Sequence, residues 1–381
     1  MTYPETGRQS FSKPKFMRYT FSHTLQPVVA TGHILWGLDS ATADQTTRSF
    51  GLRNVISTTP YEFPWCAYIA DVITSFASND EPTSQSEVLT KCYTFRVNGC
   101  SAILGYILHE IVEKIEWSDS WSIDHHQRTV TLAVPATATA DMRSRVLEDT
   151  LQATRKLGLI SMLQSWRDET FPVYGPEGQL LLEIERCATA LFGIVTYGVQ
   201  LLCYVRDEQG LRLWIGRRSE RKQTYPGMLD TTAAGGLVTG KLPIEALICE
   251  AHEEASLPEE MVRDKVKPIS HLTYFHVRGS KAGGEISLLQ PEVEYTYELE
   301  LDPGMTPKPR DTEVESFSLY TIDEVLCALK EGQFKPNSAI VIVEFLILHG
   351  IIRAENESGY AEILSHLHRE LQFPVRILPS T

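Results

Sequence analysis

The sequence predicts an α+β protein in which a smaller mixed α/β domain precedes a mixed β-sheet covered by helices. Three observations lead to this prediction. The chain has 381 residues, a length typical of two or three domains. Its residues are 43% apolar and 22% charged, as in ordinary globular proteins. Strand-like and helix-like patterns also alternate through the second half. We place the domain boundary so that residues 1–182 form the first domain and 183–381 the second.

The net charge and the cysteines indicate which partners and which cellular compartment to expect. The formal net charge of −14 disfavours nucleic acid as a partner, because an acidic chain repels the phosphate backbone. Seven scattered cysteines without a CxxC pair are typical of a reduced, cytoplasmic protein. No apolar run approaches the ~20 residues that span a bilayer, so no membrane partner is expected. Residues 1–20 lack a secretory core, and their basic residues leave a transit peptide as the less favoured reading. We expect a monomer or a homodimer.

The first domain mixes helix and strand signals. The polar stretch 78–86 contains a proline and predicts a surface loop. Isoleucines recur every four residues over 102–115 and predict an amphipathic helix. A turn with two adjacent histidines separates two predicted strands, and we favour a plain turn there over a metal site. The predicted strands are 121–124 and 128–132, and a further helix is expected over 141–157.

The second domain interleaves strands with helices, which predicts a mixed sheet with helices packed on it. Apolar runs rich in β-branched residues predict the strands, and apolar stripes at helical spacing predict the helices. The expected strands are 180–184, 194–205, 211–215 and 294–301, and the expected helices are 243–256, 322–330 and 338–349.

An acidic patch on the helix 243–256 is the main chemical signal. Glu250, Glu253 and Glu254 stand at positions i, i+3 and i+4, so they crowd onto one helix face. Three like charges repel unless a cation lies among them, and a hard divalent ion such as Mg²⁺ prefers oxygen ligands. Gly235 and Gly236 before the helix allow the backbone to approach a ligand closely. The competing interpretation is a solvated acidic helix face.

This stretch resembles the Nudix hydrolase signature G-x5-E-x7-R-E-U-x-E-E-x-G-U, where U is an aliphatic residue. Gly235 and Leu257 match its ends, and the three glutamates match its metal-binding positions. The resemblance implies a Nudix α/β/α sandwich that hydrolyses a diphosphate linkage with Mg²⁺ or Mn²⁺. Lys241, Cys249 and Ser256 replace the first Glu, the Arg and the second Gly of the pattern.

Further segments narrow the resemblance to the Nudix proteins associated with thiamine pyrophosphokinase, which combine an N-terminal α/β domain with a Nudix domain. Members without the kinase are implied to convert thiamine diphosphate, or an oxidised analogue, to the monophosphate. Gln200 and Asp168 stand where the family leads us to expect His and Asn, so the substrate stays open. The segments are 166–169, 191–194, 197–199, 217–219, 222–230, 311–315 and 334–338.

The resemblance also suggests site roles. The glutamates on the helix would hold the metal, with Glu253 and Glu254 acting in catalysis, and a Glu outside the signature would serve as base or further ligand. For that last role we expect Glu313, with a surface turn as the even alternative. The substrate-binding candidates are Arg217, Arg218 and Lys222 for phosphate, Trp166 and Tyr225 for an aromatic ring, and Gly235 and Gly236 for backbone approach.

Each substrate-binding candidate has a plainer interpretation, and two alternative functions stay open. The basic residues could be a solvated strand end, the aromatic residues could belong to the core, and Cys249 is read as helix packing. The substrate could instead be a prenyl or other specialised-metabolite diphosphate. The chain could also be a catalytically silent binding protein in which Lys241 places a fixed cation near the metal site. The first domain is expected to cover the substrate.

Overall fold

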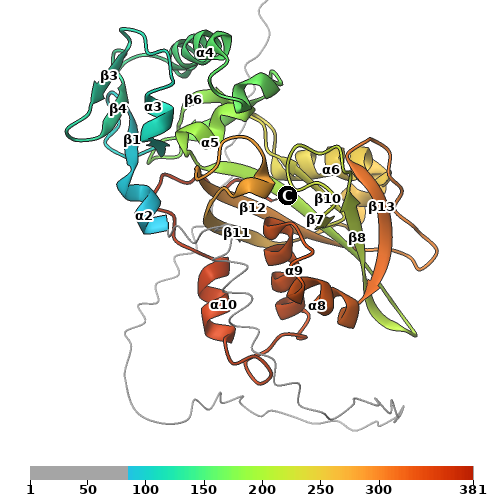
Figure 1. Ribbon diagram of the computed structural model, residues 1–381. Coiled ribbons are helices and arrows are strands. Elements are labelled where there is room, and N and C mark those ends of the chain that lie inside the picture. Colours follow the sequence, from blue (N-terminus) through green and yellow to red (C-terminus); the bar gives the residue numbers. More distant parts are fainter. Residues whose placement is uncertain (1–84, 381) are drawn as a thin grey trace, which may run out of the picture. The chain divides into compact units, whose positions relative to one another are not determined.

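The structure is a computed structural model that describes residues 85–380, which lie within one compact unit (Figure 1). The expectations for residues 1–20 and for most of the loop 78–86 lie outside the described residues. Gln85 and Ser86, the last two residues of that predicted loop, begin helix α2 (Gln85–Thr90) instead.

A four-stranded sheet forms the centre of the N-terminal part, in the order β2-β1-β4-β3. Strands β1 and β4 are parallel and the other pairs are antiparallel. The two strands predicted around the histidine turn are confirmed, and the Asp124 carboxylate accepts hydrogen bonds from two backbone N–H groups of that turn. The strands are β1 (Cys92–Val97), β2 (Gly105–Leu108), β3 (Trp121–Asp124) and β4 (Thr129–Leu132).

The helix predicted over 102–115 is wrong. Strand β2 and the single turn α3 (His109–Val112) occupy this segment. A four-residue spacing is also a multiple of the two-residue strand period, so it does not distinguish a strand from a helix. Gly105 pairs with Phe95 of β1, and a Cβ at Gly105 would lie 2.2 Å from the Phe192 carbonyl oxygen. This close contact with Phe192, which lies far from Gly105 in the sequence, is made by the extended backbone of β2.

A long helix and a two-stranded sheet complete the N-terminal part. The helix predicted over 141–157 is confirmed as α4 (Ala140–Leu157). Thr139 caps its start, and Gly158 ends it in the left-handed conformation. Strands β5 (Thr170–Tyr174) and β6 (Leu180–Glu185) pair antiparallel. The remaining short elements are η1 (Met162–Ser165), η2 (Arg186–Ala188) and α5 (Thr189–Phe192).

The second part is built on a seven-stranded mixed sheet with the path β11-β12-β7-β8-β13, while β10 pairs with β7 and β9 with β8. Strand β12 runs parallel to β7, and the other pairs in this sheet are antiparallel. The strands are β7 (Thr196–Asp207), β8 (Gly210–Arg218), β9 (Leu229–Asp230), β10 (Ala233–Gly236), β11 (Lys267–Val277), β12 (Leu289–Glu300) and β13 (Val314–Thr321).

Helices cover both faces of this sheet. Val199 and Leu201 of β7 pack in one core with Leu247 of α6, whereas Leu202 packs in another with Val341 of α9. Figure 1 shows α8 and α9 side by side against the sheet. The mixed α/β architecture predicted from the sequence is therefore confirmed. The helices are α6 (Pro243–Ala255), α7 (Glu259–Lys265), α8 (Ile322–Lys330), α9 (Pro336–Leu348) and α10 (Tyr360–Leu367), with the short η3 (Ser280–Ala282).

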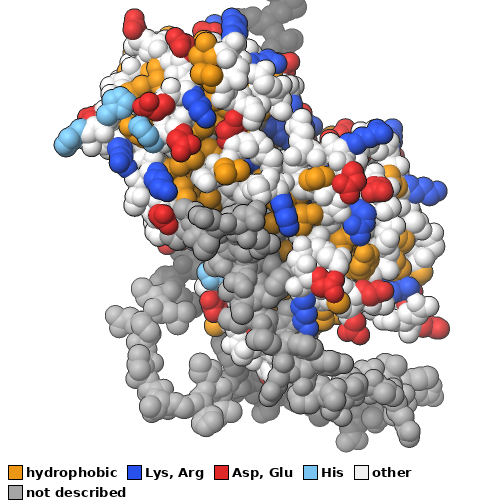
Figure 2. Space-filling view, in the orientation of Figure 1, with side chains coloured by type: hydrophobic (Ala, Val, Ile, Leu, Met, Phe, Trp, Pro, Cys, Tyr) orange, Lys and Arg blue, Asp and Glu red, His pale blue; other side chains and the backbone are white. Residues whose placement is uncertain are grey.

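On the face seen in Figure 2, acidic and basic side chains are interspersed and hydrophobic ones are scattered. Within residues 85–380, no helix is both long and apolar enough to cross a membrane.

Candidate active site

A cavity of about 700 Å³ opens where the two parts of the chain meet. The N-terminal part contributes residues from η1 through α5, and the second part contributes the β7, β10, β11 and β12 region with α6 and the start of α9. Eight of the residues singled out from the sequence line this cavity. They are Arg218, Lys222, Tyr225, Gly235, Gly236, Glu250, Glu253 and Glu313.

Of the three glutamates of α6, Glu250 and Glu253 line the cavity, and Glu254 is buried next to them on the same helix. Glu250 is half-buried, Glu253 is exposed at the wall, and Glu254 is only 6% exposed. The Glu254 carboxylate accepts a hydrogen bond from the Ala234 backbone N–H at 2.8 Å. Burial and the neighbouring acids raise the pKa of Glu250 to about 7 and that of Glu254 to about 8. These carboxylates therefore form a crowded acidic site, in which the positive charges of Arg186 and Lys222 offset the rise in pKa only in part.

Gly235 places Glu250 directly against the backbone. A Cβ at Gly235 would lie 2.0 Å from the Glu250 Oε1 atom, so only glycine leaves room for this carboxylate. A Cβ at Gly236 would lie 2.4 Å from the Cζ atom of Phe171, which belongs to β5 of the N-terminal part. The backbone approach predicted for these two glycines thus accommodates protein side chains.

The carboxylates are not gathered into a closed ligand set. Among the described residues, no three His, Cys, Asp or Glu side chains converge closely enough to hold a metal ion. The oxygen-donor chemistry fits a hard divalent cation, and the raised pKa values of Glu250 and Glu254 reflect charge that such a cation would neutralise.

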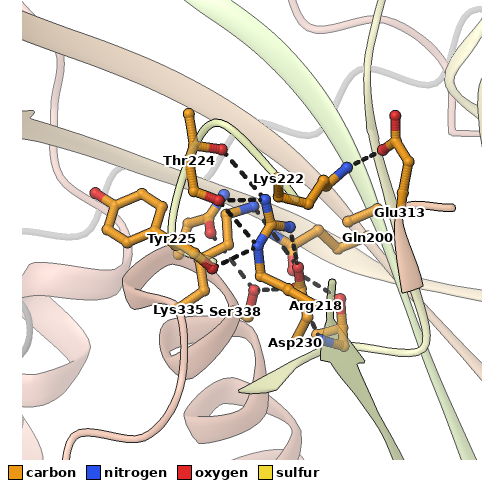
Figure 3. A network of polar contacts seen from close by, with 12 residues as sticks. Gln200, Arg218, Lys222, Thr224, Tyr225, Asp230, Glu313, Lys335 and Ser338 are labelled. Carbon is orange, nitrogen blue, oxygen red and sulfur yellow. Dashed lines mark hydrogen bonds and ion pairs between the residues drawn. The ribbon is translucent and has the colours of Figure 1, made fainter. Parts of the chain in front are cut away.

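Lys222 and Glu313 form an ion pair at the cavity wall, and Figure 3 shows the two side chains directed toward each other. Burial lowers the pKa of Lys222 to about 8, although the negative charge of Glu254 opposes this shift. Glu313 is half-buried and lines the cavity. It also lies in the bend just before β13, so the turn and the cavity wall coincide at this residue.

Arg218, which lines the cavity, lies at the centre of a polar network (Figure 3). Its guanidinium donates to the Asp230 carboxylate at 2.7 Å and to the carbonyl oxygens of Thr224 and Tyr225 at 2.7 and 3.1 Å. Asp230 also accepts a hydrogen bond from Ser338, and Lys335 lies 4.0 Å away. Most donors of Arg218 are thus engaged with the protein, and they hold the loop that carries Tyr225.

Two of the predicted substrate contacts lie away from the cavity lining. Trp166 donates to the Asp168 carboxylate at 2.8 Å, and the Arg155 guanidinium stacks 5.3 Å from the Trp166 ring centre. Arg217 donates to the Gly227 carbonyl at 2.8 Å. These contacts give both residues structural roles.

The departures from the Nudix pattern have local structural explanations. The Lys241 Nζ atom donates to the Cys249 Sγ atom at 3.8 Å, so the residues that replace the usual Glu and Arg still contact each other. Ser256 ends α6 in the left-handed conformation with φ of 55°, where the pattern has glycine. Its hydroxyl donates to the Lys308 carbonyl at 2.9 Å.

Several residues that line the cavity were not predicted as site residues. Arg186 pairs with Glu169 at 2.8 Å, and its positive charge is the main influence that lowers the pKa of Glu250. Both residues come from the N-terminal part; Arg186 lies outside the segments that carry the resemblance, and Glu169 ends the segment 166–169 without a predicted role. The Thr170 carbonyl of β5 also accepts a hydrogen bond from the Thr239 N–H at 2.9 Å, which ties β5 to the loop before α6.

The loop 278–288, between β11 and β12, also joins the two parts. The Glu285 carboxylate accepts hydrogen bonds from the Ser161 N–H at 2.5 Å and the Met162 N–H at 3.0 Å. On its other side, the Lys281 carbonyl accepts from the Tyr225 N–H at 2.9 Å. The loop is thus fastened on both sides of the cavity.

Replacement of Glu285 by Gln is expected to weaken this fastening, because an amide accepts hydrogen bonds more weakly than a carboxylate. We expect a loss of about 1 kcal/mol in stability and faster amide hydrogen exchange over 278–288. Thermal unfolding and exchange mass spectrometry would measure both. Lys281→Ala is the control, since that side chain is exposed. Unchanged exchange in Glu285→Gln would contradict the assignment.

Comparison with known families matches the two parts separately. Residues 71–196 match the domain of unknown function DUF4743, and residues 196–342 match the NUDIX domain. The two matches meet at the start of β7. The boundary at 182/183 stays a prediction, and residue 183 lies inside β6.

Several known proteins are similar to the chain. Nudix hydrolase 20, chloroplastic, of Arabidopsis thaliana is 32% identical over 87% of this chain and 86% of that protein. An uncharacterized protein of Saccharomyces cerevisiae is 38% identical over 61% of this chain and 70% of that protein. The crystal structure of DR0079 from Deinococcus radiodurans is 21% identical over 45% of this chain and 97% of that one, with a TM-score of 0.34. The predicted cytoplasmic location stays a prediction. The chain belongs to the Nudix hydrolase family, whose members act on phosphoric anhydrides.

Proposed function

We propose that the chain is a Mg²⁺-dependent diphosphatase that converts thiamine diphosphate, or an oxidised analogue, to the monophosphate. The observation that carries this proposal is a single cavity lined both by acidic residues of α6 and by basic residues. Glu250 and Glu253 supply oxygen donors for a cation, while Lys222 and Arg186 supply positive charge for phosphate oxygens. A volume of about 700 Å³ suits a small organic diphosphate.

Glu250, Glu253 and Glu254 would hold the ion, which Mn²⁺ could replace. When bound, the divalent ion supplies charge neutralisation and Lewis acidity at the diphosphate. Lys222, a positively charged group among the carboxylates, would orient the phosphate oxygens. Glu313 would accept a proton from the attacking water and is our candidate base, a role supported by its position in the cavity lining and its ion pair with Lys222. Tyr225 lines the cavity as a candidate for stacking on the organic ring.

We further propose that the N-terminal domain completes the active site. Its residues Arg186, Glu169 and Phe171 line the cavity, and β5 bonds to the loop before α6. This extends the predicted role of substrate coverage, because the domain also supports the loop between β10, which carries Gly235 and Gly236, and α6.

The alternatives gain less support from the described residues. The prenyl-diphosphate alternative was motivated by Asp168, Gln200 and Lys241, and none of these lines the cavity. Lys241 is exposed and contacts Cys249, so it offers little support for a fixed cation that would replace the metal in a silent binding protein.

Phosphate release with and without Mg²⁺ would test the proposed function. The panel is thiamine diphosphate, its oxo analogue and a prenyl diphosphate. We expect metal-dependent release from the thiamine compounds at least about tenfold faster than from the prenyl compound, because binding energy for the correct organic group is realised in the transition state. Preference for the prenyl compound would support the alternative substrate. No metal-dependent release from any of the three would support the silent binding protein.

A further inference from the structure

The β12 side of the cavity carries two acidic residues outside the Nudix signature. Glu292 and Glu294 are two residues apart on β12, so both side chains are on the same face of the sheet. Both line the cavity, and Glu294 is only 6% exposed. Glu294 lies opposite Gly198 on the parallel strand β7, and a Cβ at Gly198 would lie 2.4 Å from the Glu294 Oε2 atom. The strand is therefore shaped to receive this carboxylate.

A tyrosine joins the two carboxylates. The Tyr274 hydroxyl is within hydrogen-bond distance of Glu292 and also of the Glu294 Oε1 atom, at 3.1 Å. One hydroxyl carries one hydrogen, so it donates to only one of these carboxylates at a time. Asn337, at the start of α9, donates to the same Glu294 Oε1 atom at 3.1 Å. Among residues 85–380, the buried Glu294 Oε2 atom has no hydrogen-bond partner, which is costly for an acid group.

The basic residues nearby are engaged elsewhere. The Lys335 Nζ atom lies 4.0 Å from the Asp230 carboxylate, and the Arg278 guanidinium donates to the carbonyl oxygens of Ala282 and Gly283. Over residues 85–380, no Lys or Arg forms an ion pair with Glu292 or Glu294. Burial and the charge of Glu292 raise the pKa of Glu294 to about 7. Among the described residues, the two acids thus repel each other without a direct ion pair, and the more distant charge of Lys335 offsets the rise in the pKa of Glu294 only in part.

We propose that Glu292 and Glu294, which the buried Tyr274 hydroxyl joins from behind the cavity wall and which we call the acid pocket, bind the organic cation of a substrate whose diphosphate lies at α6. The ligand class is a diphosphate ester with a fixed positive charge on its organic group, such as a quaternised heterocycle. This inference rests on the proposed function, in which thiamine diphosphate has such a ring. An organic cation fits better than a bare ion, because the cavity is large and Tyr225 adds an aromatic ring to its wall.

The backbone conformation and a hydrogen bond both hold Tyr225 in the cavity wall. Its φ of 50° is uncommon for a bulky residue, and the Arg218 guanidinium holds its carbonyl. Tyr225 lines the same cavity as Glu292 and Glu294, and the charge of Glu292 contributes to the raised pKa of its hydroxyl. An aromatic ring next to a carboxylate pair is a favourable environment for an organic cation.

Calorimetric binding in EDTA, where turnover is blocked, would test the acid pocket on the full chain. The two ligands are thiamine diphosphate and 3-deazathiamine diphosphate, the neutral isostere with carbon in place of the charged ring nitrogen. Because the diphosphates are identical, their affinity ratio isolates recognition of the cation. We expect the cation to bind about tenfold or more tightly than the isostere, and Glu294→Gln and Glu292→Gln to bring the ratio close to one.

Glu300→Gln on the same strand is the matched control, because Glu300 is exposed and outside the cavity. A wild-type ratio near one, a ratio that survives in both acid-pocket variants, or failure of both ligands to bind would overturn the proposal. Titration with Mg²⁺ or K⁺ alone is a further arm, and Glu294-dependent binding of either ion would overturn it in favour of an inorganic cation. Circular dichroism would check that each variant is folded.

The outcome is separable from that of the proposed function. A cation preference without any Mg²⁺-dependent phosphate release would retain the acid pocket and reject the diphosphatase. Phosphate release from thiamine diphosphate at equal efficiency in wild type and Glu294→Gln, together with an unchanged affinity ratio, would retain the diphosphatase and reject the acid pocket.

Discussion

Glu250→Gln is expected to lower Mg²⁺-dependent phosphate release about a hundredfold or more, with little change in stability. The substitution keeps the size of the side chain beside Gly235 but removes the negative charge at the cavity. Loss of a metal-binding carboxylate should have at least the effect seen for residues that support metal ligands, about 10–100-fold. Because burial already disfavours the charged form of the half-buried Glu250, the neutral amide should not destabilise the fold. Steady-state kinetics over a range of Mg²⁺ concentrations would measure the loss.

The control for this variant is Glu245→Gln on the same helix. Glu245 is exposed, lies outside the cavity lining, and its replacement changes the helix charge equally. We expect its activity to stay within about twofold of wild type, as for most surface substitutions. Equal activities of the two variants would show that Glu250 does not act in catalysis.

Asp230→Ala is expected to destabilise the fold by about 3–5 kcal/mol, which is the range for breaking a buried ion pair by removal of one partner. The carboxylate is 8% exposed, and it is bonded to Arg218 and Ser338. Removing it would leave the Arg218 guanidinium buried without its counter-charge. Chemical denaturation followed by circular dichroism would measure the change in the free energy of unfolding.

Asp302→Ala supplies the comparison, since its pairing with Lys265 at 3.6 Å is solvent-exposed. Such pairs contribute about 0–1 kcal/mol. Similar losses in both variants would argue against a special role for the Asp230 network.

The Asp230 network also predicts a dependence on pH. Lys335 and Arg218 lower the pKa of Asp230 to about 2, against an opposing effect of burial. Because the folded pKa lies below the unfolded value of about 3.9, the stabilisation is fully present above that value and is lost as pH falls toward 2. Two pKa units correspond to about 2–3 kcal/mol. Asp230→Ala should flatten the stability curve in this acid range.

The sequence predicted the part of the site in which spacing along one helix determines geometry. Glu250, Glu253 and Glu254 had to share a face once the segment was helical, and the apolar stripe on the other side made it so. The glycines before the helix were identified by the same local pattern. Their exact contacts, with Glu250 and Phe171, needed the tertiary structure.

The rest of the site depends on contacts between segments far apart in the sequence. Arg186 and Glu169 form part of the cavity because β5 and β6 pack beside α6, and no local pattern announces that arrangement. Glu292 and Glu294 alternate with apolar residues, a pattern equally typical of a solvent-facing strand. The segment 102–115 was misread for a related reason, since one spacing suits both kinds of element.

The hydrogen bond between the Thr170 carbonyl and the Thr239 N–H has an evolutionary consequence. The Nudix domain and the N-terminal domain cannot change independently at this contact. A shift of either backbone would disturb the loop between Gly236 and α6, the helix that carries Glu250. Compensating changes in relatives should therefore arise as pairs across the two domains. Substitutions that reduce activity should therefore be found in both domains.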